Sequence, residues 1–255
     1  TATISVYDKL QGSLVTSNAI TVVGVAASAK SGVTETVLLI GDSLIQEGDI
    51  GQTLLDIAST DVMGVTLVGT RGTGANKNEG RGGWKVSDYA TAGRTFYVFT
   101  VSGVTTSPQI NSTDYTHDGC TYRVQEMNLS GGSGTITCER TVGSTAPLAS
   151  GTLTKTGLGV GDATIAFSAS AAASGNPFWI SGALNFSQYL VNNSITTPTV
   201  VAIELGTNDV FAATTDASAV STAVSALANL DTLIANIKAV NGTINQFALQ
   251  DLGGD

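Results

Sequence analysis

Charged side chains are scarce in this sequence, and positive charge is nowhere concentrated. Asp, Glu, Lys and Arg make up 12% of the 255 residues, about half of the usual share of ~25%. The 11 lysines and arginines are scattered along the chain, and the formal net charge is −9. Because contacts to phosphates need clustered lysine and arginine, the sequence argues against a nucleic-acid-binding protein.

Long apolar runs are missing as well. No run approaches the ~18 residues that would indicate a membrane span, and no basic segment followed by an apolar one opens the chain, as a signal peptide requires. We therefore expect neither a membrane span nor a signal peptide. Hydrophobic residues nevertheless make up 42% of the chain, enough for one large domain or two modest ones to bury a core.

Cysteine is also rare. Cys120 and Cys138 are the two cysteines, and they are not spaced as a CxxC metal or redox pair. Two interpretations stay open, either buried thiols in neighbouring strands or one disulfide. We expect no metal site and no cofactor.

Short apolar runs predict buried strands at residues 37–40, 65–68, 200–205 and 247–249. Continuous runs of this kind are typical of parallel strands that are buried on both faces. Helical spacing follows the first run, over residues 50–57, and follows the third, over residues 216–240. Because strands alternate with helices, the sequence predicts a layered α/β domain with right-handed crossovers.

The helix over residues 216–240 is the longest that the sequence predicts. Asp216 is its expected N-cap, since a short polar side chain just before an apolar period marks a helix start. The face that we expect to be buried consists of Val220, Val224, Leu227, Ile234 and Ile237.

Two other segments show a period of two instead. Residues 96–168 contain short alternating runs separated by glycine-rich turns, which predicts an inserted all-β domain. The predicted α/β domain then comprises residues 31–95 and 169–255. Residues 1–30 predict a β-hairpin or the end of an upstream β domain.

Polar motifs follow three of the predicted strands. Gly41-Asp42-Ser43-Leu44 comes directly after the first, a loop containing Gly83 follows the second, and Gly206-Thr207-Asn208-Asp209 follows the third. Since the carboxyl ends of parallel strands meet at one edge of a sheet, we expect these motifs to converge. A serine near a helix start is usually a cap and a loop glycine usually a turn residue, so the prediction depends on their joint placement.

The motifs resemble those of the SGNH (GDSL-type) hydrolase family, with a GDS(L) turn, a glycine after the second strand and a GxND loop in that order. The resemblance covers about residues 34–90 and 171–255. It implies a serine esterase with the flavodoxin-like three-layer SGNH hydrolase fold, whose parallel sheet is interrupted by the all-β insertion. By this resemblance Ser43 is the catalytic nucleophile, and the oxyanion hole consists of the Ser43 N–H, the Gly83 N–H and the Asn208 side-chain amide.

The fourth motif of this family, an Asp and a His three residues apart, does not follow the GxND loop. The only histidine is His117, which ends the sequence Asp114-Tyr115-Thr116-His117. We reject it as the catalytic base because it precedes the GxND motif and lies in a segment that predicts a solvent-facing turn. A serine nucleophile needs an adjacent base, so we expect the Asp/His block beyond residue 255.

The insertion resembles a small β module that recurs in bacteriophage tail and other virion proteins. The similarity lies in segments 115–124, 150–155 and 161–165. It implies a virion (phage tail) or extracellular location, with other virion proteins as partners. The two resemblances together imply an esterase for acyl esters such as O-acetyl groups on a surface polysaccharide. The alternative is a non-catalytic carbohydrate-binding or structural tail module, and the oligomeric state stays open.

Overall fold

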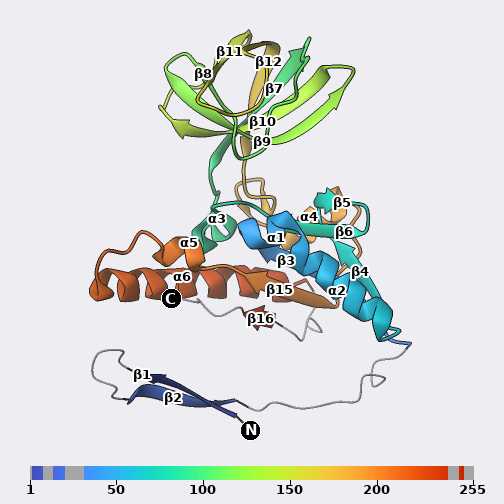
Figure 1. Ribbon diagram of the computed structural model, residues 1–255, viewed down its shortest axis with the longest axis vertical. Coiled ribbons are helices and arrows are strands. Elements are labelled where there is room, and N and C mark those ends of the chain that lie inside the picture. Colours follow the sequence, from blue (N-terminus) through green and yellow to red (C-terminus); the bar gives the residue numbers. More distant parts are fainter. Residues whose placement is uncertain (1, 8–13, 21–31, 241–246, 250–255) are drawn as a thin grey trace.

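The computed structural model describes residues 2–7, 14–20, 32–240 and 247–249. Figure 1 shows three parts along the long axis of the molecule: a β-barrel, a mixed sheet with its helices, and a two-stranded hairpin. The hairpin consists of β1 (Ala2–Tyr7) and β2 (Leu14–Ile20), which pair antiparallel.

Six antiparallel strands close into the barrel in the order β10-β7-β12-β11-β8-β9. They are β7 (Thr95–Ser102), β8 (Asp114–His117), β9 (Cys120–Ser130), β10 (Ser133–Val142), β11 (Gly151–Thr156) and β12 (Thr164–Ser174). Tyr97, Phe99 and Val101 of β7 are all buried, because alternate side chains of a strand point to the same face. Phe99, Tyr122 and Leu153 are fully buried in the barrel core. The stretch 96–168, predicted as an all-β insertion, falls within these strands and their connections.

The second sheet is organised around β3 (Thr34–Gly41). Its other strands are β4 (Gly64–Val68), β5 (Arg71–Thr73), β6 (Asn76–Gly80), β15 (Val200–Glu204) and β16 (Phe247–Leu249). β3 pairs parallel with β4, β6 and β15, and β15 pairs parallel with β16, whereas β5 and β6 are antiparallel. A separate short hairpin joins β13 (Trp179–Ile180) and β14 (Ala183–Leu184).

Helices accompany the mixed sheet. They are α1 (Ser43–Glu47), α2 (Asp49–Thr60), α3 (Val86–Ala90), α4 (Phe186–Asn192), α5 (Thr207–Val210) and α6 (Asp216–Lys238). Successive side chains of β3 lie on opposite faces of the sheet. Leu38 shares a core cluster with Leu233 of α6, while Leu39 shares another with Leu54 of α2. The apolar run of β3 is therefore explained by burial on both of its faces.

The predicted fold class is wrong. We expected a flavodoxin-like three-layer SGNH hydrolase fold with a parallel sheet, but the molecule is mostly β and is dominated by a closed six-stranded antiparallel barrel. The sheet beside the barrel is mixed, and β3 meets β6 through two residue pairs. The apolar run at 37–40 correctly indicates that β3 is a buried strand with parallel neighbours, but it says nothing about the rest of the fold. The longer stretches with a period of two instead close on themselves by antiparallel pairing.

Two details of the long helix also differ from the prediction. Its N-cap is Thr215, whose side chain accepts a hydrogen bond from the Ser218 N–H, and Asp216 is the first helical residue. The residues that α6 buries are Ala226, Leu230, Leu233 and Ile237. Three residues of the predicted face, Val220, Val224 and Leu227, are instead 63%, 62% and 58% exposed. By length and composition α6 could cross a membrane, but its buried face packs against the mixed sheet.

The two cysteines lie in neighbouring barrel strands. Cys120 begins β9 and Cys138 is in β10, and these strands pair antiparallel. Both thiols are free and buried. Of the two interpretations that the sequence left open, the structure has the pair of buried thiols.

Candidate active site

The three predicted motifs lie at the carboxyl ends of adjacent strands. Gly41, the last residue of β3, is paired with Glu204 at the end of β15 and with Gly80 at the end of β6. Ser43 begins α1 directly after this point, and its side chain is exposed. A serine placed there is open to a ligand that approaches the edge of the sheet.

The side chain of Asn208 connects the other two motifs. Its Nδ2 atom donates to Asp42 Oδ2 at 2.7 Å and to the backbone oxygen of Trp84 at 3.1 Å. Asp42 precedes Ser43 and Trp84 follows Gly83, so Asn208 lies between the two loops that carry these residues. Both N–H groups of the amide are engaged in these contacts, because a side-chain amide carries two.

The backbone of Gly83 is suited to a site that a ligand must approach closely. Gly83 is exposed, has a φ of +71°, and an added Cβ would meet nothing within 4 Å. The left-handed conformation favours glycine at this position. The carbonyl of Gly83 accepts a hydrogen bond from the Arg94 guanidinium, which holds the loop in place.

A pair of carboxyl groups lies next to the serine. Asp42 Oδ1 accepts a hydrogen bond from the Leu44 N–H at 3.0 Å and so caps α1. The Glu204 carboxyl group is a neighbour of the Asp42 carboxyl group, and its buried Oε2 atom has no hydrogen-bond partner among the described residues. Burial, followed by the neighbouring Asp42, raises the pKa of Glu204 to about 7, because adjacent carboxyl groups resist ionising together. The pair therefore retains a proton up to near-neutral pH.

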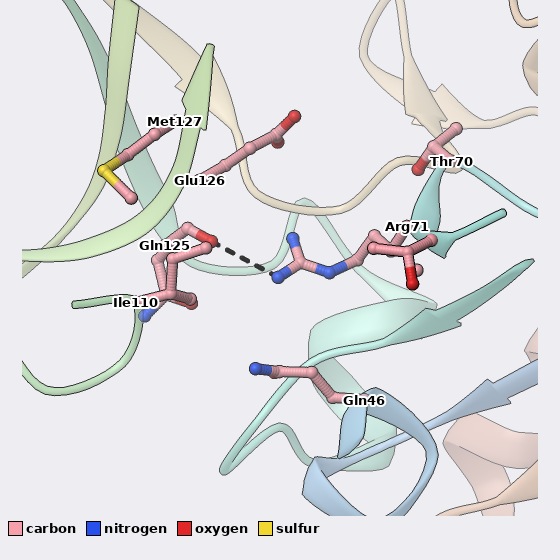
Figure 2. Close-up of a pocket in the computed structure, with 9 residues that line it drawn as sticks. Gln46, Thr70, Arg71, Ile110, Gln125, Glu126 and Met127 are labelled. Atoms are coloured by element: carbon pink, nitrogen blue, oxygen red, sulfur yellow. Dashed lines mark hydrogen bonds between the residues drawn. The ribbon is translucent and has the colours of Figure 1, made fainter. Parts of the chain in front are cut away.

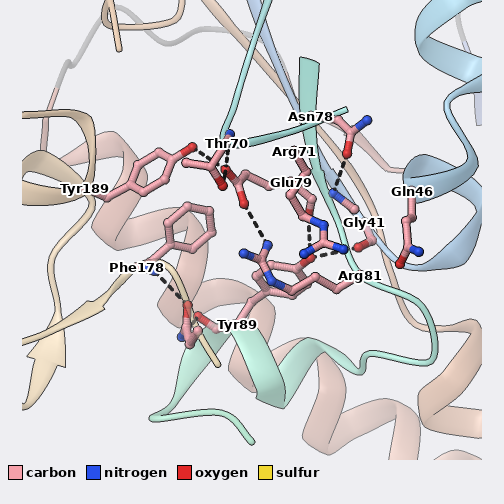
Figure 3. Close-up of polar contacts among 12 residues, drawn as sticks. Gly41, Gln46, Thr70, Arg71, Asn78, Glu79, Arg81, Tyr89, Phe178 and Tyr189 are labelled. Atoms are coloured by element: carbon pink, nitrogen blue, oxygen red, sulfur yellow. Dashed lines mark hydrogen bonds and ion pairs between the residues drawn. The ribbon is translucent and has the colours of Figure 1, made fainter. Parts of the chain in front are cut away.

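A fully buried ion pair supports this edge of the sheet from inside (Figure 3). Glu79 Oε2 contacts Arg81 Nη1 at 2.6 Å, and neither side chain is more than 8% exposed. Glu79 Oε1 accepts hydrogen bonds from the Tyr189 hydroxyl and from the backbone and hydroxyl of Thr70, each at 2.6 Å. Burial alone would raise the pKa of Glu79, but Arg81 and these donors hold it below its usual value. Glu79 is thus a satisfied structural carboxylate.

Close backbone contacts join this support to the serine turn. The Tyr89 hydroxyl donates to the Gly41 oxygen at 2.8 Å, and the Arg81 N–H donates to the same oxygen at 2.9 Å. Gly80 lies against α1 so closely that an added Cβ would overlap the backbone of Gln46. The position of Ser43 is therefore fixed by β6 as well as by its own strand.

His117 is placed in the barrel. Its Nδ1 atom is 3.0 Å from the Thr152 oxygen, and its ring packs edge-on against Phe167 at a centroid distance of 4.9 Å. Both partners belong to barrel strands, which Figure 1 shows apart from α1. The contacts of this histidine are therefore with the barrel and not with the serine turn.

Sequence reasoning missed four charged residues that shape the site. Asp42, Glu79, Arg81 and Glu204 are all buried, although their residue types predict exposure. A signal was present for two of them, because Glu204 interrupts an otherwise apolar run and Asp42 closely follows another. Glu79 and Arg81 lie at the end of β6, a strand that the apolar pattern does not predict. A buried charge needs a partner. Asp42, Glu79 and Arg81 each have one, whereas Glu204 Oε2 has no hydrogen-bond partner among the described residues.

Comparison of the chain with protein-family models, curated proteins and solved structures finds no match.

Proposed function

We propose that this chain carries the nucleophile and the oxyanion-binding loops of an SGNH-type serine esterase. Ser43 is the nucleophile, and the oxyanion donors are the Ser43 N–H, the Gly83 N–H and the Asn208 amide. The observation that carries the proposal is the position of Asn208, whose amide bonds to the residues adjacent to Ser43 and Gly83. Three motifs distant in the sequence thereby lie around one exposed serine.

In the proposed reaction the Ser43 hydroxyl oxygen attacks the acyl carbonyl, and negative charge develops on the carbonyl oxygen. Donors that are fixed in advance stabilise this charge, and the loss of one typically costs ~10²–10³ in rate. Because both N–H groups of Asn208 are engaged, one of them exchanges its present acceptor for the oxyanion. The proton of Ser43 passes to a histidine outside these 255 residues, since His117 is held in the barrel.

The substrate that we propose is an acyl ester, such as an O-acetyl group on a surface polysaccharide, and the location is a phage tail or another extracellular setting. These finer proposals depend on the sequence resemblances. The competing function is a non-catalytic carbohydrate-binding or structural tail module. One observation favours it, namely that the Asn208 amide already has two acceptors in this structure.

The test supplies the missing base as a small molecule. We expect the 255-residue chain to hydrolyse p-nitrophenyl acetate very slowly, and added imidazole to raise a Ser43-dependent rate, because general base catalysis is worth ~10²–10⁴-fold. Ser43→Ala should abolish the increase that remains after subtraction of the reaction of imidazole itself. Ser59→Ala, which changes an exposed serine of α2, is the matched control and should retain it.

A longer natural chain that contains the expected Asp/His block should hydrolyse the ester without imidazole. Circular dichroism must show that each protein is folded. Folded proteins with no Ser43-dependent turnover in either experiment would contradict the esterase and favour the binding module.

A further inference from the structure

Two adjoining cavities lie between the barrel and the mixed sheet, with volumes of about 430 and 400 Å³. The larger one is bounded by α1, β5 and the barrel strand β9, as Figure 2 shows. Gln125 of β9 lines both cavities. We call the two together the junction cleft.

The junction cleft begins at the proposed oxyanion loop. Gly82 and Gly83 line the smaller cavity, and Gln46 of α1 lines the larger one. The Gly82 N–H donates to the Gln46 side-chain oxygen. An added Cβ on Gly82 would lie 3.1 Å from Asn111 Nδ2 and 3.2 Å from Gln46 Oε1, so this loop touches both walls. Gln46 also lies three residues after Ser43, on the same side of α1.

The lining combines hydrogen-bonding amides with apolar side chains. Gln46 and Gln125 carry both donors and acceptors. Gln46 Oε1 already accepts from Gly82 and Gln125 Nε2 already donates to Glu139, which leaves the donor of Gln46 and the acceptor of Gln125 for a ligand. Ile110 and Met127 add apolar surface. Arg71 crosses the cleft, and its Nη2 atom donates to the backbone oxygen of Gln125 at 3.2 Å (Figure 2). Within the described part of the chain, the buried Nε atom of Arg71 has no hydrogen-bond partner.

Three guanidinium groups and two carboxylates line the cleft, and a carboxylate lies near each guanidinium group. Arg71 and Glu126 line the same cavity. In the other cavity, Arg94 Nη1 contacts Glu139 Oε1 at 3.0 Å. The third guanidinium group, Arg123, contacts Asp114 Oδ1 at 2.8 Å. An anionic ligand would therefore compete with carboxylates that already lie beside these guanidinium groups, whereas an uncharged ligand would not.

We propose that the junction cleft binds an uncharged, polyhydroxylated chain, that is, an oligosaccharide, and that the barrel supplies one wall of this site. Its role as the binding site for the non-reacting part of the substrate rests on the proposed function. Hydroxyl groups match amides that donate and accept, and the C–H faces of a sugar match Ile110 and Met127. Contacts remote from the reacting atoms orient the ester at the nucleophile.

The test is an NMR titration of the 255-residue chain with unacylated hexasaccharides. The neutral probes are hexamers of glucose, galactose, N-acetylglucosamine and rhamnose, and the anionic probes are hexagalacturonate and inorganic phosphate. We expect at least one neutral hexamer to shift the side-chain amide signals of Gln46 and Gln125. The proposal is overturned if no neutral hexamer does so, or if an anionic probe binds more tightly than every neutral one.

Two variants locate the binding. Ile110→Ser and Glu126→Ala should each weaken it about threefold to tenfold, the effect of one lost contact. Both side chains are exposed, so neither change removes core packing. Gln52→Ala, an exposed position of α2, is the matched control and should leave the affinity unchanged. Unchanged affinity in both cleft variants would mean that the sugar binds elsewhere and would overturn the proposal.

Binding and turnover fail separately in this design. Ser43→Ala should bind the hexamer as the parent chain does, because the probe carries no ester. Sugar binding without Ser43-dependent turnover would support the sugar site in the junction cleft and contradict the proposed esterase activity. Turnover without sugar binding would do the reverse.

Discussion

The barrel and the mixed sheet bury very different residues. The barrel core consists of aromatic and aliphatic side chains together with two thiols, and Phe99, Ile136 and Leu153 have no exposed surface. The region around the ends of β3, β6 and β15 instead buries charged residues. These are Asp42, Glu79, Arg81, Glu204 and Asp209. Buried charges need partners and offer little net stability. Their concentration at this edge therefore supports the proposed site, and the apolar barrel core supplies rigidity.

Two polar residues that the barrel buries, Gln125 and Glu139, lie where it meets the other part. Gln125 Nε2 bonds to Glu139 Oε2 at 3.2 Å, and Glu139 accepts from Arg94, which precedes the first barrel strand. Arg94 also bonds to Asp88 of α3 at 3.1 Å. The junction cleft therefore marks the boundary between the part that buries charged residues and the part whose core is apolar. Variants on either side of this boundary can test the contrast.

The largest effect is expected at the buried ion pair. Glu79→Ala leaves the Arg81 guanidinium buried without its carboxylate and removes the acceptor of Tyr189 and Thr70. Breaking such a pair typically costs about 3–5 kcal/mol of the free energy of unfolding. Urea unfolding at pH 7 measures the loss.

The matched control for this change is Glu47→Ala, at an exposed position of α1. Surface substitutions of this kind usually stay within about 0.5 kcal/mol. Equal, small losses in both variants would show that the charges around β6 are not tightly coupled and would remove the contrast between the two regions.

A substitution that creates a cavity in the barrel core should lower the free energy of unfolding by a similar or slightly smaller amount, for a different reason. Leu153→Ala removes a fully buried side chain from the barrel core, and such changes cost about 2–5 kcal/mol. Since no charge is uncovered, we expect the loss to be the same at pH 5 and pH 8. A loss that changes by more than about 1 kcal/mol between these values would show that the barrel core is coupled to the carboxyl groups.

The sequence predicted β3 and β15 because their apolar runs are short and continuous, and it placed Ser43 and Asn208 in the loops that follow them. It placed Gly83 after the run 65–68, but that run is β4, and the strand that leads to Gly83 is β6, which has no apolar run. It could not predict the fold class, because closure of the barrel depends on pairing between strands distant in the chain. It also misplaced the buried face of α6. The helix carries apolar residues on several sides, and only tertiary contacts decide that Leu230 and Leu233 are buried while Val224 is not. The partners of Glu204 are likewise set by the sheet and not by its neighbours in sequence.

The carboxyl pair should make stability depend on pH. The folded protein keeps a proton on Glu204 up to about pH 7, whereas the unfolded chain releases it near 4.5. The folded state then binds more protons, so the free energy of unfolding falls as the pH rises from about 4.5 to 7. With allowance for solvent screening, the fall due to this group is on the order of 1–2 kcal/mol.

Glu204→Gln should flatten this part of the profile, measured by urea unfolding between pH 4.5 and 7.5. The pKa of Asp209 is also raised by burial and contributes with the same sign, so the difference between parent and variant isolates Glu204. Glu47→Gln is the exposed control. If the parent and Glu204→Gln keep the same slope, Glu204 does not hold the proton.

The smallest effect is expected at the barrel thiols. Because the barrel core is apolar and closed, we expect almost no alkylation of Cys120 and Cys138 in the folded protein. Burial raises the pKa of Cys138, and Cys120 is buried with its Sγ atom 3.3 Å from the Thr145 oxygen. Alkylation requires an accessible thiolate, so iodoacetamide at pH 8 should leave both cysteines unmodified in the folded protein. Mass spectrometry after denaturation should then show two labelled residues, which also confirms that the thiols are free. Rapid labelling of the folded chain would mean that the barrel opens readily, and in that case it could not act as the rigid wall of the junction cleft.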